Sequence, residues 1–111
     1  MDEFSPSRLV EREDGSFSLT FDDFGATELT MTARGLEGGG YTWHAVVESL
    51  VRLHAPELEE RVRYDPEGSM FAAYGDDREA LLTVAQLIRR AIGDDAVLLE
   101  AIDNADEDLL E

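Results

Sequence analysis

The chain has 111 residues, no cysteine and a formal net charge of −17, because 26 acidic residues stand against nine arginines. Its length fits one domain over residues 1–111, and the lack of cysteine excludes a disulfide framework and a thiolate metal site. The charge argues against nucleic acid and anionic membrane surfaces as partners and favours a basic protein. Because residues 1–15 lack a signal-peptide pattern and no apolar run reaches membrane-spanning length, we expect a cytoplasmic protein.

The first residues predict a β-hairpin. Ser7–Arg12 can form a strand, and Asp14-Gly15 is a typical hairpin turn because both residues tolerate positive φ. In Ser16–Phe21, apolar and polar residues alternate strictly. This alternation predicts a strand whose aromatic face, formed by Phe17, Leu19 and Phe21, points inward.

The segment Thr27–Arg34 fits two structures. Its apolar residues alternate as in a strand, yet Gly35 directly after it is a typical helix C-cap. We favour a short helix, and the strand remains the alternative.

The stretch Gly35–Trp43 organises the chain. Four of the nine glycines lie in these nine positions, which indicates positive φ or a close approach of other groups. We expect a positive φ at Gly38 or Gly40. The stretch lacks the lysine and the spacing of nucleotide-binding glycine loops, so we interpret it as a structural turn.

Directly after the glycines, apolar residues recur at helical spacing. They predict a core helix over Thr42–His54, with Thr42 as N-cap. Trp43, the only tryptophan, lies on the apolar stripe of the first turn, so we expect it in the core. His54 lies on the same stripe, where a hydrogen-bonded structural histidine is the expected role.

A second hairpin follows Pro56 and one possible further helical turn. Arg61–Asp65 and Ser69–Tyr74 are predicted strands on either side of the turn Pro66-Glu67-Gly68. Val62 and Tyr64 share one face of the first strand.

The last third is helical. A long helix follows Gly75-Asp76-Asp77 and stops at Gly93, with a periodic apolar stripe between them. Asp94 can cap a final helix that reaches about Ile102. Five of the last nine residues, 103–111, are acidic and form a predicted solvated tail. The whole order predicts an α+β fold, with an antiparallel sheet from two hairpins and helices packed mainly on one face.

The chain offers little catalytic chemistry. Its two histidines are ten residues apart and no nucleophile motif is present. Acidic pairs at Asp22/Asp23, Asp76/Asp77 and Asp94/Asp95 allow a metal-binding or hydrolytic alternative, although helix capping explains two of them. We therefore expect no enzyme activity, no cofactor and no metal site.

Two motifs together resemble a known family. Gly35–Trp43 is similar to the G-x-E-G-x-G-Y-x-W signature of the immunity protein 51 family, in which Gly35, Gly38, Gly40, Tyr41 and Trp43 are the matching structural positions. Tyr64–Phe71 resembles its second motif, an aromatic-D-P-E segment before an apolar strand. The resemblance covers roughly residues 27–102. Gly39 departs from the asparagine of many members, which removes a side chain that could fix the turn.

The resemblance implies a small antitoxin that binds and blocks a cognate toxin encoded beside it, without catalytic residues or cofactor. The charge favours a basic toxin, and an acidic inhibitor that mimics nucleic acid is an alternative. Acidic residues in the two motif loops and at strand ends are the candidate contacts, although residues of this kind also cap local backbone N–H groups. The predicted partner-binding residues are Glu37, Asp65, Glu67, Asp22, Asp23, Asp76 and Asp77. The oligomeric state is left open.

Overall fold

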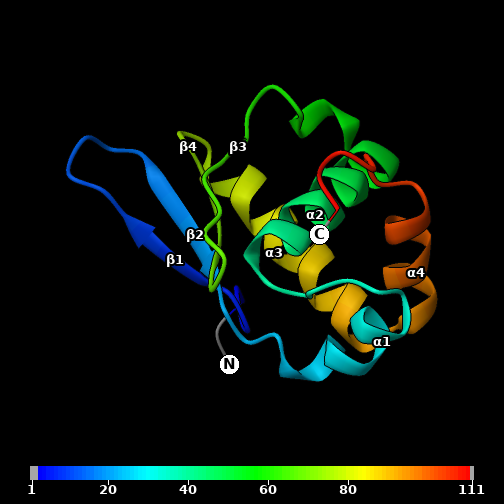
Figure 1. Cartoon of the computed structure of the whole chain (residues 1–111). Helices are drawn as coiled ribbons and strands as arrows, with labels where there is room; N and C mark the ends of the chain where they lie inside the picture. The colour runs from blue at the N-terminus through cyan, green and yellow to red at the C-terminus, as the bar shows by residue number, and fades with distance from the viewer. Residues whose placement is uncertain (1–2, 111) are drawn as a thin grey trace.

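The computed structural model describes residues 3–110. Within this range the chain forms a four-stranded antiparallel sheet and four α-helices, the predicted α+β class (Figure 1). Met1 and Asp2, and Glu111 of the predicted acidic tail, lie outside the described residues. The elements are β1 (Arg8–Glu11), β2 (Phe17–Phe21), α1 (Glu28–Ala33), α2 (Gly40–His54), β3 (Arg63–Tyr64), β4 (Phe71–Gly75), α3 (Arg78–Gly93) and α4 (Asp95–Asp103), with 3₁₀ turns at Gly25–Thr27 and Pro56–Leu58.

The sheet has the strand order β1-β2-β4-β3, and every neighbouring pair is antiparallel. The two predicted hairpins are therefore present, and β2 and β4 join them at the centre. The register places Phe17 opposite Gly75 and Phe21 opposite Phe71. As a result, the end of β2 lies beside the start of β4, and the start of β2 lies beside the end of β4.

The helices cover one face of this sheet (Figure 1). Leu19 and Phe21 of β2 and Phe71 and Ala73 of β4 are buried. These alternate residues therefore point toward α2 and α3. These side chains join the apolar stripes of the helices in one hydrophobic cluster. Burying apolar surface stabilises the fold by about 25 cal/mol per Å², so this face contributes most of the driving force.

The first hairpin closes as predicted. Gly15 has a φ of 88°, and Asp14 accepts hydrogen bonds from the backbone and hydroxyl of Ser16, at 3.0 and 2.6 Å. The hydroxyl bond, then the backbone bond, lowers the pKa of the Asp14 carboxyl. The short polar side chain thus holds the turn that glycine makes possible.

The helix that we favoured for Thr27–Arg34 is confirmed. The two strands of the second hairpin begin later than predicted. Helix α1 spans Glu28–Ala33. Strand β3 begins only at Arg63, because Arg61 still donates to Leu58 in the preceding turn, at 2.9 Å. Strand β4 begins at Phe71, because Glu67 and Met70 exchange backbone hydrogen bonds in a tight turn.

Helix α2 begins two residues earlier than predicted, so the N-cap prediction for Thr42 is wrong. Gly39 occupies the N-cap without a side-chain bond, and the Thr42 hydroxyl instead accepts from the Gly38 N–H at 3.1 Å. The predicted apolar stripe is buried, and Trp43 has no exposed surface. His54 lies at the exposed end of the helix, where Nε2 is 3.6 Å from Oε1 of Glu100.

The two C-terminal helices are capped by the predicted aspartates. Asp77 accepts from the N–H groups of Glu79 and Ala80, and Asp94 accepts from that of Ala96. The tail beyond Asp103 is exposed at its acidic residues, while its two leucines, Leu109 and Leu110, are half-buried. No helix within residues 3–110 has both the length and the apolar character needed to cross a membrane.

Candidate partner-binding surface

The two motif loops lie directly against each other, and we call the place where they touch the motif contact. The Gly40 N–H donates to the Gly68 carbonyl at 3.1 Å. A Cβ on Gly39 would overlap the Gly68 carbonyl oxygen, and one on Gly40 would overlap the carbonyl oxygens of Glu67 and Met70. In this structure, the backbone of the second motif therefore occupies the space that side chains at Gly39 and Gly40 would need.

The prediction of a positive φ in the glycine stretch, at Gly38 or Gly40, is confirmed at Gly38. The φ of Gly38 is 79° and that of Gly35 is 74°, whereas Gly40 is the first residue of α2 and is helical. A Cβ on Gly38 would also lie only 3.1 Å from Cβ of Met31. The glycine stretch thus meets two requirements: a positive φ and close packing against neighbouring atoms.

Aromatic rings fix both loops to the sheet. The ring of Trp43 meets that of Phe21 edge to face, with centroids 5.0 Å apart. The next residue, His44, lies over Tyr64, with centroids 4.7 Å apart. Tyr64 in turn lies 6.1 Å from Phe71. Edge-to-face and tilted pairs of this kind are favourable, so the loops are held rigidly.

Burial shifts the pKa of two groups in this cluster. It lowers the pKa of His44 below 6.5, although the nearby Glu48 carboxylate acts in the opposite direction. It raises the pKa of the Tyr64 hydroxyl, and the charges of Glu48 and Glu59 add to that effect. Both groups are therefore neutral at pH 7, which suits a role in packing more than in acid–base chemistry.

Exposed acidic side chains surround the motif contact. Glu37 and Glu67 are exposed in the two loops, and Asp65 is exposed on the edge strand next to them. Asp22 and Asp23 follow the end of β2, which the register places beside the start of β4 and hence beside the second motif. Five of the seven predicted residues therefore lie at one end of the sheet.

A small hollow joins the first motif to the end of β2. Its volume is about 180 Å³, and Glu28 and Glu37 lie on its rim. The other lining residues are Phe24, Gly25, Gly38 and Gly39. We call the exposed carboxylates of Asp22, Asp23, Glu28, Glu37, Asp65 and Glu67 the acidic end.

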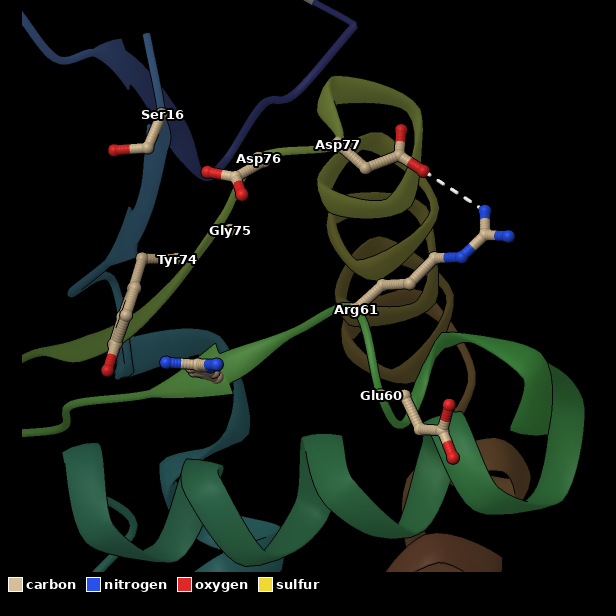
Figure 2. Close-up of a pocket in the computed structure, with 8 residues that line it drawn as sticks. Ser16, Glu60, Arg61, Tyr74, Gly75, Asp76 and Asp77 are labelled. Atoms are coloured by element: carbon tan, nitrogen blue, oxygen red, sulfur yellow. Dashed lines mark hydrogen bonds and ion pairs between the residues drawn. The ribbon is translucent and has the colours of Figure 1, made fainter. Parts of the chain in front are cut away.

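Asp76 and Asp77 lie at the opposite end of the sheet. They follow Gly75, which pairs with the first residue of β2, so the geometric condition for one continuous patch is not met. Figure 2 shows them beside a hollow of about 460 Å³, with Tyr74 and Ser16 across from them. The Asp77 carboxylate already has partners there, because it caps α3 and lies 3.2 Å from the Arg61 guanidinium.

Sequence reasoning missed three residues near the acidic end. Glu28 and Leu29 were not identified as contact candidates, and Leu29 is 87% exposed. Tyr41 stands among the structural motif positions, yet it is 46% exposed, and its ring edge lies 3.8 Å from where a Gly68 Cβ would be. The helix favoured for residues 27–34 could have predicted that Leu29 is exposed, because helical spacing places it on another side of the helix from Met31.

Within residues 3–110, no three side chains of His, Cys, Asp or Glu converge in a group that could hold a metal ion. The paired acids cap helices, follow strand ends or face solvent, as described above.

Comparison with known proteins matches one family. Residues 7–107 of the chain match the family model described as Immunity protein 51. Neither the curated proteins nor the solved structures contain a match. The matched range includes both motif loops, every strand and every helix described above. Because the match covers nearly the whole sequence, the chain belongs to the immunity protein 51 family.

Proposed function

We propose that this protein binds and neutralises a cognate toxin as a stoichiometric partner in the cytoplasm, and that the acidic end contacts a basic surface of that toxin. The observation that carries the proposal is the absence of partners for the six carboxylates there. Within residues 3–110 none of them takes part in an ion pair or a side-chain hydrogen bond. Their charge is therefore available to a partner.

The free state of these acids favours binding over local capping. Asp14, Asp77 and Asp94 show what capping looks like in this chain, since each accepts backbone N–H bonds at 2.9 to 3.3 Å. Glu37 and Glu67 make no comparable bond. The motif contact holds their loops rigidly, and binding residues commonly lie on loops fixed by a rigid scaffold.

Apolar and aromatic surface accompanies the charge. Tyr41 and Leu29 expose 46% and 87% of their surface beside the acidic end. Protein interfaces typically combine a few aromatic or apolar anchors with a charged rim that guides encounter. Tyr41 is the proposed anchor, and the carboxylates are the proposed rim.

The test is the rate of association with the toxin encoded beside the gene, measured against salt concentration. The parent should associate more slowly as salt rises, because screening shortens the Debye length to about 10 Å at 0.1 M. Glu37→Arg combined with Glu67→Arg should slow association at low salt by about tenfold or more and leave the melting temperature nearly unchanged.

Glu57→Arg combined with Glu60→Arg is the matched control, because it changes the net charge by the same amount at another place. Both residues are exposed, in and just after the 3₁₀ turn that follows α2. If the control slows association as much as the loop variants do, net charge alone is responsible. A salt-independent rate, or loop variants that unfold before they lose binding, would refute the acidic interface.

A further inference from the structure

The nine arginines of this acidic chain are not used evenly. Within residues 3–110, the side chains of five of them contact carboxylates or carbonyl oxygens, and the side chains of the other four make no ion pair or hydrogen bond. Acids outnumber arginines by 26 to nine, so unpaired arginines are unexpected in this chain. The unpaired ones are Arg8, Arg12, Arg63 and Arg90.

Two of these arginines stand on the open side of strand β1. Arg8 is opposite Thr20 and Val10 is opposite Ser18, and both partners alternate with the buried Leu19 and Phe21. Arg8 and Val10 therefore point away from the helices. Arg12 extends the same series, and its guanidinium lies 5.9 Å from the centre of the Tyr74 ring.

Strand β1 also has a free edge. It is the terminal strand of the sheet and, among the residues that the structure describes, it pairs with β2 alone (Figure 1). The Arg12 N–H bonds to the Ser16 carbonyl at 2.8 Å. Because inward and outward backbone groups alternate in an antiparallel pair, the N–H and C=O groups of Leu9 and Glu11 point to the free side.

We propose that this β1 edge binds an extended acidic segment of a partner protein as a fifth, antiparallel strand. Strand addition satisfies exposed backbone groups, and alternate side chains give it specificity. In the added strand, three alternate residues would lie on the open face opposite Arg8, Val10 and Arg12. Opposite charges favour cross-strand pairs, so the expected pattern is acid-x-apolar-x-acid.

The backbone of β1 favours a polypeptide over nucleic acid here. Its outward N–H and C=O groups match the hydrogen-bonding pattern of another peptide backbone. Val10, 53% exposed between the two arginines, further suits an apolar side chain. The proposal is independent of the toxin interface, because it concerns the β1 edge and its test needs no toxin.

The probe is a capped peptide with the core Glu-Thr-Val-Thr-Glu, titrated into the full chain and followed by NMR amide shifts. Shifts should centre on Leu9 and Glu11. A peptide with both glutamates replaced by lysine should bind at least about tenfold more weakly. A tenfold change corresponds to about 1.4 kcal/mol in binding free energy. Arg8→Glu with Arg12→Glu should reverse this preference.

Two controls separate strand addition from general charge attraction. N-methylation of the two threonines, whose N–H groups face Leu9 and Glu11, should abolish binding, whereas N-methylation of the valine should not. Arg90→Glu, which changes an unpaired exposed arginine on α3, should leave binding unchanged.

Arg8→Gln with Arg12→Gln covers the case in which charge reversal disturbs folding, and it should also weaken binding of the glutamate peptide. Equal binding of both peptides, shifts centred elsewhere, or unchanged binding in the glutamine variant would overturn the proposal. Stronger binding of a single-stranded oligonucleotide, or self-association of the chain through β1, would overturn the assignment to a partner segment.

Discussion

The motif contact and the β1 edge use backbone in opposite ways. At the motif contact, the backbone of one loop occupies the space of side chains in the other, and Gly40 is bonded directly to Gly68. At the β1 edge, the backbone groups of Leu9 and Glu11 face outward, and the side chains of Arg8 and Arg12 make no ion pair or hydrogen bond within residues 3–110. The family signature therefore marks where the fold is fixed, while surfaces outside its glycines are free to bind.

The largest expected effect is at Trp43, which has no exposed surface. Trp43→Ala should lower the free energy of unfolding by about 3–5 kcal/mol, because it leaves a large cavity in the core. Tyr41→Ala is the control within the same motif, and its 46% exposure predicts a much smaller loss. Denaturant titration measures both. A Trp43 variant as stable as the parent would show that the motif contact does not depend on this anchor.

A smaller effect is expected at Gly40. Gly40→Ala forces a methyl group into two carbonyl oxygens, so it should destabilise by about 1–3 kcal/mol, although alanine is usually the better helix former. Gly93→Ala has no atom within 4 Å of the new Cβ and should change stability by no more than about 0.5 kcal/mol. Similar values for the two variants would contradict the close approach of the two loops.

Side chains of β1 on the sheet face that points away from the helices should contribute little to the free energy of unfolding, in contrast to the residues of the motif contact. Arg12→Ala removes the guanidinium from the Tyr74 ring and should cost about 0.5–1 kcal/mol. Arg8→Ala, which lacks such a ring contact, should be nearly neutral. Thermal unfolding of both variants checks this. A large loss for Arg8→Ala would mean that β1 is structural and not a free binding edge.

The smallest expected effect is a pH dependence at His44. Burial holds its pKa below the ordinary 6.5, so the unfolded chain takes up this proton first as pH falls. This contribution to stability is complete above pH 6.5 and is lost as pH falls below it. His44→Gln should flatten the stability profile in that window, which urea titrations at a series of pH values measure. An unchanged slope in the His44 variant would mean that the ring is not buried against Tyr64.

The sequence predicted the local structure well where local physics decides it. Alternation in Phe17–Phe21 and the apolar stripes of α2 and α3 identified buried faces, because burial imposes the period of the element. Asp14-Gly15, Asp77 and Asp94 were predictable because turns and caps use short-range hydrogen bonds. Thr42 failed as a cap because contacts with a distant loop allowed α2 to begin at Gly40.

What the sequence by itself determined is therefore the set of elements, the α+β class and the two motif loops. Only the tertiary structure decided which loops meet and which charges stay free. The strand order and register set Asp22 and Asp23 beside the motif contact and put Asp76 and Asp77 at the far end of the sheet. The physical reason is that pairing between distant segments depends on the summed packing of whole faces, which no short stretch of sequence contains.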